Sequence, residues 1–284
     1  MPPYAWIDSD YQYPPYNIAM EELLRSKSTK QGSWFLTYRN QPSVIIGRNQ
    51  EALAETSTAG LASGIPIFRR TTGGGAVYHD EGNLNWAFIQ NGSLEDRSSL
   101  VSLIIAGLRS LGLDVREGAR GGLYIESYKI GGTASSVSNG SLLFHGTILI
   151  QTDLEQLHTC LAAESVKYRR VNSSNTLPYK GIASVPSPVA NISSFLPTLS
   201  VPVVKQALHR AITHNSELNN NNNAPEINMA LIQSMATAYE DPTWIYKRLD
   251  SHSDRKDHHE SARDFRQLPQ SAGRCSPGLI YHHR

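Results

Sequence analysis

Apolar positions recur with strand and helix periods through about the first 215 residues. Asn17 can cap a helix that runs through residues 18–24. Residues 34–38 and 44–46 read as strands on either side of a turn at residues 40–42. Residues 84–89 alternate, and we expect a strand with one apolar face formed by Leu84, Trp86 and Phe88.

The later pattern adds helices between further strands. Residues 98–111 predict a helix that ends at Gly112, and a helix that begins near Ser200 carries a stripe of Val204, Leu208 and Ile212. Two short strands, residues 142–144 and 147–150, flank His145-Gly146. Because strands and helices do not alternate strictly, we predict an α+β fold with mixed or antiparallel sheets flanked by helices.

An asparagine run at residues 219–223 divides the chain. We interpret residues 1–216 as one catalytic domain, residues 217–226 as an Asn-rich linker, and residues 227–284 as a short C-terminal segment. One helix is expected at about residues 227–239. The chain after Asp250 is charged, rich in histidine and without apolar periodicity, so we expect disorder there.

Composition narrows the class of protein. The 284 residues are 39% hydrophobic and 18% charged, as in a globular protein, and the formal net charge of +1 gives no broad electrostatic footprint for nucleic acid or membrane. Only Cys160 and Cys275 occur, so neither a disulfide framework nor a cysteine-rich zinc site is expected. The start, Met-Pro-Pro-Tyr, shows no targeting leader.

The segment from Phe68 to Asp80 holds the most informative pattern, because two arginines and three consecutive glycines follow a short strand. Glycine lets backbone N–H groups approach a ligand, successive N–H groups form an anion cradle, and Arg70 adds a fork suited to phosphate or carboxylate. Neither Gly-Lys-Ser/Thr nor G-x-G-x-x-G is present. Taken alone, a flexible hairpin with two surface arginines explains the segment equally well.

Two further segments are weaker when each is read alone. Lys129-Ile130-Gly131-Gly132 places a lysine beside paired glycines, although a lone lysine is usually a solvated surface group. Phe144-His145-Gly146-Thr147 places a histidine in a sheet, where histidine is usually structural.

Together the three segments resemble lipoate–protein ligase A and its mitochondrial lipoyltransferase relatives. The resemblance rests on Arg-Arg-x-x-Gly-Gly-Gly-Ala-Val-Tyr-His-Asp from Arg69, Lys-Ile-x-Gly-x-Ala from Lys129 and His-Gly-Thr-x-Leu from His145, and it covers about residues 12–215 in order. Ser187-Pro188-Val189 is most similar to fungal members.

The resemblance implies the biotin/lipoyl protein ligase catalytic fold and an adenylate-forming enzyme. Such an enzyme would activate lipoate or octanoate with ATP and Mg²⁺, and the resemblance implies no metal ligand in the protein. Arg70 matches a nucleotide-contacting arginine. Gly75, Ala76, Val77 and Tyr78 match residues that line the adenylate, and Lys129 matches the lysine that contacts both the acyl carboxyl and the phosphate.

The resemblance also implies the partners and the location. The acyl acceptors would be apo lipoyl domains of 2-oxoacid dehydrogenase E2 subunits and the glycine cleavage H protein. Eukaryotic members are mitochondrial, and without a transit peptide the alternative location is cytoplasmic. Full bacterial ligases carry a C-terminal accessory domain, and we expect no full one here.

Departures from the family pattern leave alternatives open. Arg120-Gly121-Gly122 stands where the family has Arg-Asn-Asp, and Pro186 and Pro188 replace a basic pair. A transferase that uses preformed acyl-AMP or a carrier-bound acyl group is one alternative, and a non-catalytic module that binds lipoyl domains is another. The sequence does not choose between octanoate and lipoate.

We predict that a truncation after Asp250 leaves stability and activity unchanged, because the residues beyond it lack apolar periodicity. Five of the ten histidines fall there (His252, His258, His259, His282 and His283) without the spacing of a zinc site. Thermal melting and acyl transfer by the truncated chain would test this. A lower melting temperature or a slower transfer would contradict it.

Overall fold

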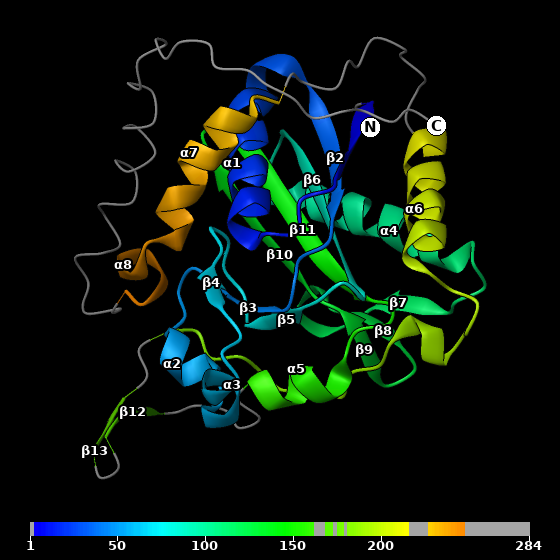
Figure 1. Cartoon of the computed structure of the whole chain (residues 1–284). Helices are drawn as coiled ribbons and strands as arrows, with labels where there is room; N and C mark the ends of the chain where they lie inside the picture. The colour runs from blue at the N-terminus through cyan, green and yellow to red at the C-terminus, as the bar shows by residue number, and fades with distance from the viewer. Residues whose placement is uncertain (1–2, 162–167, 173–174, 179–180, 216–226, 248–284) are drawn as a thin grey trace, which may run out of the picture. The chain divides into compact units, whose positions relative to one another are not determined.

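Two long strands, β6 (Asn83–Asn91) and β11 (Ser141–Leu149), pair antiparallel in the middle of a five-stranded sheet with the order β1-β2-β6-β11-β10 (Figure 1). At one edge, β1 (Tyr4–Ser9) runs parallel to β2 (Ser33–Tyr38), and at the other β10 (Thr133–Ser138) runs antiparallel to β11. This computed structural model describes residues 3–161, 168–172, 175–178, 181–215 and 227–247. The sheet is mixed and helices flank it, so the α+β prediction is confirmed.

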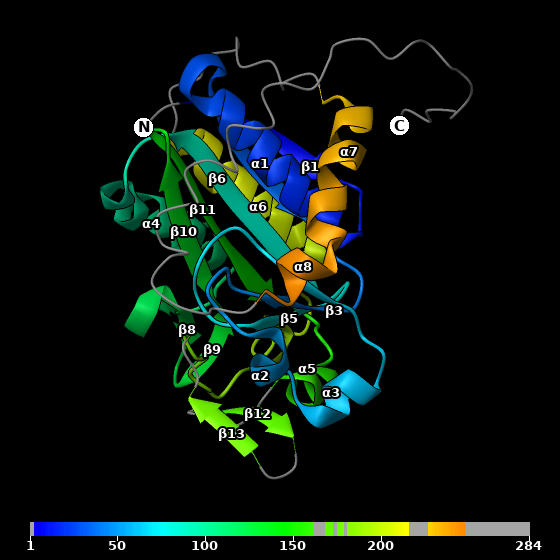
Figure 2. The same ribbon diagram turned by 90° about the vertical axis from the view of Figure 1, so that its left-hand side faces the viewer.

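Helices cover both faces of the sheet (Figure 2). Leu84, Trp86 and Phe88 of β6 pack in one cluster with α4 (Arg97–Arg109) and α6 (Val201–Asn215). Ala87 and Ile89 pack on the other face with α1 (Pro14–Gln31) and α7 (Met229–Glu240). The prediction of a single apolar face on β6 was therefore wrong, because small and aliphatic side chains on its second face lie under α1.

Three smaller sheets complete the described strands. A mixed sheet has the order β4-β3-β5, from β3 (Ser43–Ile46), β4 (Ile67–Arg69) and β5 (Val77–His79). An antiparallel sheet joins β7 (Val115–Glu117), β8 (Leu123–Ile125) and β9 (Tyr128–Gly131), and β12 (Tyr168–Asn172) pairs with β13 (Asn175–Pro178). The first sheet carries the glycine-rich loop between β4 and β5, and the second carries Lys129.

The remaining elements are short. They are the helices α2 (Ala52–Glu55), α3 (Thr58–Ala62), α5 (Leu154–Cys160) and α8 (Pro242–Ile245), and the 3-10 turns η1 (Leu94–Asp96), η2 (Ala119–Gly121) and η3 (Ile192–Ser194). None of the helices in the described ranges combines the length and apolar character that a bilayer-spanning helix needs.

Two local predictions were wrong. Helix α1 begins at Pro14, not after Asn17, because Pro14 and Pro15 fit the first helical turn, where a missing N–H costs nothing. Residues 141–149 form one strand instead of two. Gly146 lets this strand continue past the Trp86 ring, because a Cβ at this position would lie 2.5 Å from the ring.

Other predictions were confirmed. Val204, Leu208 and Ile212 are buried, as their helical stripe predicted. The helix expected at residues 227–239 is α7. The asparagine run and the segment after Asp250 lie outside the described residues.

Candidate functional site

Arg70 shapes the glycine-rich loop from beneath. Its guanidinium donates to the carbonyl oxygens of Gly73 (2.5 Å), Gly75 (2.8 Å) and Ile45 (3.2 Å), and its Nε donates to Thr72 Oγ1 (3.1 Å). Because Arg70 is buried, its pKa falls to about 10, an effect that the nearby Glu21 opposes. Arg70 therefore keeps its charge, and the loop carbonyls point toward that charge.

The loop's N–H groups point elsewhere. Within the described structure, the amides of Gly73, Gly74 and Gly75 have no hydrogen-bond acceptor. Gly74 has φ 88°, and its carbonyl packs so tightly on Gly47 that a Cβ on Gly47 would lie 2.2 Å from that oxygen. Side chains are excluded at these two glycines, and the three amides have no protein acceptor in the described residues; the anion cradle stays a prediction.

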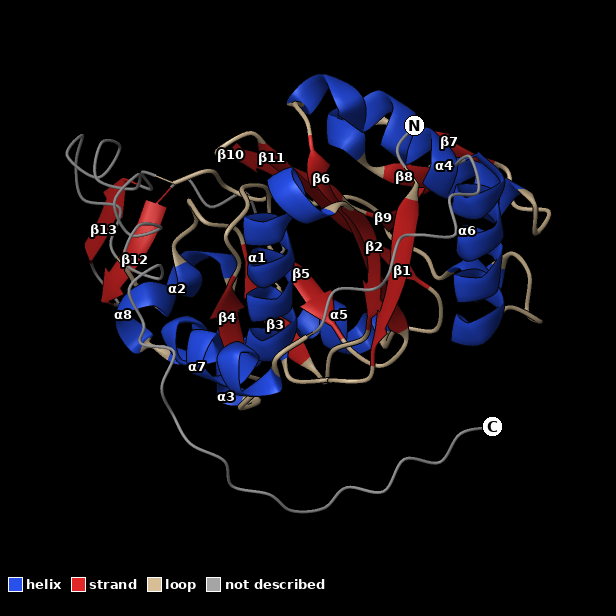
Figure 3. Ribbon diagram, turned by 90° about the horizontal axis from the view of Figure 1, so that it is seen from above, coloured by secondary structure: helices blue, strands red, loops and turns tan. Residues whose placement is uncertain are grey.

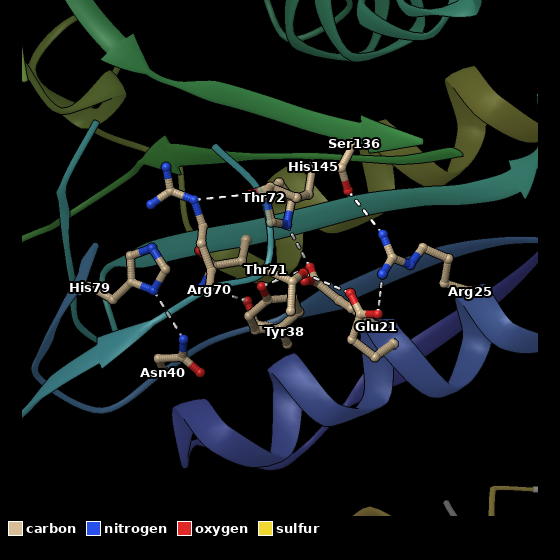
Figure 4. Close-up of polar contacts among 12 residues, drawn as sticks. Glu21, Arg25, Tyr38, Asn40, Arg70, Thr71, Thr72, His79, Ser136 and His145 are labelled. Atoms are coloured by element: carbon tan, nitrogen blue, oxygen red, sulfur yellow. Dashed lines mark hydrogen bonds and ion pairs between the residues drawn. The ribbon is translucent and has the colours of Figure 1, made fainter. Parts of the chain in front are cut away.

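A buried polar network supports the loop (Figure 4). His145 of β11 lies between Glu21 of α1 and Thr72, with Nδ1 2.9 Å from Glu21 Oε1 and Nε2 2.7 Å from Thr72 Oγ1. Arg70 Nε can only donate, so the Thr72 hydroxyl accepts from it and has its own proton left for His145 Nε2. The His145 ring thus links the Thr72 hydroxyl to the Glu21 carboxylate. Tyr38 donates to the same carboxylate oxygen (3.0 Å).

A second chain of hydrogen bonds fixes His79. The Asn17 amide donates to the Tyr11 carbonyl (2.7 Å) and also to Asn40 Oδ1 (2.8 Å). The Asn40 amide nitrogen must therefore face His79 Nδ1 (3.0 Å), which accepts, and the His79 proton lies on Nε2. Nε2 is buried and has no partner in the described structure.

Lys129 stands in a wall shared by two cavities. The Tyr78 cavity has a volume of about 400 Å³, and the Arg70 cavity about 390 Å³. Tyr78 lines only the first cavity and Arg70 lines only the second, and the cavities are named after them. Both are lined by Ala76, Val77, Lys129, Gly132, Thr147, Ser184 and Val185. Burial lowers the pKa of Lys129, and the nearby Arg120 lowers it further.

The backbone of residues 184–190 closes over this wall. The Lys129 amide donates to the Pro188 carbonyl (2.8 Å), and the Ala190 amide donates to the Lys129 carbonyl (3.2 Å). Ser184 Oγ accepts from the Ala76 amide (2.8 Å) and from Gln50 Nε2 (3.1 Å). This segment is thus tied to the glycine-rich loop on one side and to β9 on the other.

The structure brings all the predicted site residues to these two cavities. Gly75 and Arg70 line the Arg70 cavity, Tyr78 lines the Tyr78 cavity, and Ala76, Val77 and Lys129 line both. Their contacts with a ligand stay predictions. Most of the Arg70 hydrogen-bonding capacity goes to its own loop, which the sequence did not indicate.

Sequence reasoning missed several lining residues: Glu21, Tyr38, His79, Arg120, His145 and Ser184. His145 was read as structural in isolation, and only its pairing with Glu21, 124 positions earlier, gives it a place in the site. One local signal existed at Arg120, where an arginine precedes two glycines. Its φ of 59° is unusual for a residue with a side chain.

Comparison with known proteins gives a consistent result. The family model for the lipoyl protein ligase A/B catalytic domain matches residues 13–213. Lipoate–protein ligase 1 of Staphylococcus aureus is 35% identical over 187 residues, which cover 64% of this chain and 54% of that protein. The chain spans about half the length of the curated relatives it matches.

Two solved structures share the fold. One, of Thermoplasma acidophilum, comes from an analysis of a bi-partite lipoate protein ligase and its E2 lipoyl domain. It is 25% identical, with a TM-score of 0.67, and the match covers 89% of this chain and 99% of that one. The other, a lipoate–protein ligase A bound with ATP, is 26% identical with a TM-score of 0.64, and the match covers 86% and 97%.

We expect acid to destabilise the fold through His79. Burial lowers the pKa of His79 most, and the nearby Arg70 and His145 lower it further, from 6.5 to about 3 in all. Between these values the unfolded chain binds a proton that the folded chain does not, so the stabilisation is complete above pH 6.5 and falls as the pH drops toward 3. The loss from this ring is about 2 kcal/mol at pH 5.

His79→Gln provides the comparison, because glutamine does not titrate and can still accept from Asn40. Urea unfolding at pH 7 and pH 5 should show a smaller acid loss for His79→Gln than for the wild type. Equal losses would contradict the assignment.

Proposed function

This chain belongs to the lipoyl protein ligase A/B catalytic domain family, and we propose that it is a lipoate–protein ligase. It joins lipoate or octanoate to AMP and then transfers the acyl group to a lysine of a lipoyl-domain protein. The observation that carries the proposal is Lys129, whose side chain belongs to two adjoining cavities of similar volume. An acyl-adenylate has two parts of different chemistry joined at one anhydride, and Lys129 stands where the parts would meet.

The nucleotide is assigned to the Tyr78 cavity. Its walls include the Tyr78 ring and the aliphatic side chains of Leu149, Leu157 and Val189, which suit the faces of a purine base. Lys129 lies in the wall shared with the other cavity, which Gly74 and Gly75 line, so the α-phosphate would lie near this wall. A lipoate–protein ligase A of this fold was solved bound with ATP, which supports ATP as the nucleotide substrate.

The acyl chain is assigned to the Arg70 cavity, although polar side chains line much of it. Glu21, Tyr38, Arg70 and His145 bond to one another or to the loop, so their polar atoms are already paired. An apolar chain then meets mainly carbon atoms and the side chains of Ile18 and Ile45. Burying the acyl chain there would leave few polar groups without a hydrogen-bond partner.

The first step brings two anions together. A carboxylate oxygen of the acid attacks the α-phosphorus of ATP, an O–P bond forms, and pyrophosphate leaves with the electron pair of the broken bond. Lys129, Arg70 and the glycine amides offset the repulsion, and one opposite-charge contact at 4 Å contributes roughly 4 kcal/mol at an effective dielectric of about 20.

Mg²⁺ would enter with the triphosphate as part of the substrate. Within the described ranges, no three His, Cys, Asp or Glu side chains gather as a metal site. Mg²⁺ commonly takes substrate phosphates and water with one or two carboxylates, so such a cluster is not required.

The second step is aminolysis. The neutral amine of the acceptor lysine attacks the acyl carbonyl, the C–O bond to AMP breaks, and the amine proton leaves to solvent or to the departing phosphate. We propose E2 lipoyl domains and the glycine cleavage H protein as acceptors. The family's eukaryotic members make the mitochondrion the proposed location.

Pyrophosphate release on mixing with ATP and lipoate tests the proposal. Release followed by acylation of an apo lipoyl domain is the expected result. Acylation from synthetic lipoyl-AMP without pyrophosphate release would instead identify a transferase that uses preformed adenylate. Neither reaction would leave a non-catalytic binding module.

We predict that Lys129→Ala lowers the rate of lipoate transfer by about 10²–10³-fold, the typical loss for one preorganised charge donor. Lys129→Arg should also lower the rate of lipoate transfer, because a planar guanidinium does not replace a compact ammonium. Lys205→Ala is the matched control, since Lys205 pairs with Asp8 and lines neither cavity. Circular dichroism should show all three variants folded, and near-normal transfer by Lys129→Ala would refute the central role of this lysine.

We also expect transfer from lipoyl-AMP to be faster than formation of the adenylate. Transfer needs one carbonyl and one neutral amine placed together, whereas adenylation must bring a carboxylate against a triphosphate. Single-turnover rates of the two half-reactions would decide this, and equal rates would contradict it.

A further inference from the structure

Arg69, the residue before the loop-shaping arginine, has a fully buried side chain on the opposite side of the chain. Its guanidinium lies among backbone carbonyls from two separate segments. On one side, Nε donates to the Trp244 carbonyl (2.9 Å) and Nη2 to the Ile245 carbonyl (2.6 Å), both in α8. On the other side, Nη1 faces three carbonyls of the turn after β3: Gly47 (3.0 Å), Arg48 (2.9 Å) and Gln50 (2.5 Å).

Helix α8 returns a hydrogen bond to the same residue. The Trp244 indole Nε1 donates to the Arg69 carbonyl (2.9 Å). Ile245 is buried in one apolar cluster with β3 and β4. Figure 3 shows α8 beside β4, although 175 positions separate Trp244 from Arg69. Helix α8 is thus docked on the strand that leads into the glycine-rich loop.

The turn at residues 47–50, which Arg69 holds, is the support of that loop. The Arg48 amide donates to the Thr72 carbonyl (2.8 Å), and Gly47 packs directly on Gly74. Gln50 donates to the Ile182 carbonyl (3.0 Å) and to Ser184 Oγ (3.1 Å). A shift of this turn would therefore move both the glycine-rich loop and the segment that closes over Lys129.

We propose that Arg69 and Trp244 are positioning residues of the acyl-adenylate site, through which helix α8 holds the glycine-rich loop in its binding conformation. The identity of the ligand in this inference rests on the proposed function. The coupling itself rests on the hydrogen bonds described above.

The chemistry of a buried guanidinium makes this coupling strong. Without α8, Arg69 would keep its charge but lose the acceptors of Nε and Nη2 where burial keeps water away, so the turn would rearrange to satisfy it. Lysine offers no planar fork that could reach carbonyls on both sides at once.

Trp244→Phe in the full-length protein tests the proposal, because it keeps an aromatic ring and removes the indole N–H donor along with the five-membered ring, and its control removes the same atoms. The matched control is Trp6→Phe, which removes the indole hydrogen bond to Thr37 Oγ1 (3.0 Å) on β1 and lines neither cavity. With lipoyl-AMP as substrate, Trp244→Phe should raise KM about two- to tenfold while kcat changes less than twofold. Trp6→Phe should leave KM unchanged.

Hydrogen exchange in the ligand-free proteins supplies a readout that does not depend on activity. The amides of Arg48 and Ala76, which donate to the Thr72 carbonyl (2.8 Å) and to Ser184 Oγ (2.8 Å), should exchange faster in Trp244→Phe than in the wild type, and at the wild-type rate in Trp6→Phe. If Trp244→Phe lowers the melting temperature as Trp6→Phe does but leaves loop exchange and KM unchanged, Trp244 is merely structural and the proposal is overturned. If the wild type does not use lipoyl-AMP, the proposed function fails, while the exchange comparison still decides the coupling.

Discussion

A loop that offers its amides to an anion must place its carbonyl oxygens elsewhere, and here two consecutive buried arginines receive them. Arg70 takes the carbonyls of the glycine-rich loop, and Arg69 takes those of the turn beneath it and of α8. Irregular backbone cannot satisfy its own polar groups as a helix or sheet does. The two guanidinium groups replace that missing pairing and leave the glycine amides available.

The same principle explains how a polar-walled cavity could take a hydrocarbon. Glu21, Tyr38, Thr72 and His145 form a connected set of hydrogen-bonded side chains, and all but Thr72 line the Arg70 cavity. A network of this kind fixes side-chain positions, because rotation of Glu21, Thr72 or His145 would break two hydrogen bonds at once. The Arg70 cavity thus has walls that are polar in composition and largely saturated in hydrogen bonding.

The sequence predicted the fold class, most element positions and the cavity-lining residues Arg70, Gly75, Ala76, Val77, Tyr78 and Lys129, because these depend on local periodicity or on a contiguous motif. It could not predict contacts between distant segments. Nothing near His145 indicates that Glu21 would face it, and nothing near Arg69 indicates Trp244. The apolar second face of β6 was missed because its burial depends on α1, and the start of α1 was misplaced because two prolines were not read as a first turn.

The opposite directions of Arg69 and Arg70 constrain how this region can change in length. Consecutive residues of an extended strand point to opposite sides, so the addition or loss of one residue within β4, before Arg69, would turn each arginine to the other side. Neither guanidinium would then face its own set of carbonyls. The glycine-rich loop and the turn at residues 47–50 would both lose their hydrogen-bond donors. Insertions and deletions should therefore be excluded from these few positions even where point substitutions are accepted, and natural length variation should be confined to other connections of the chain.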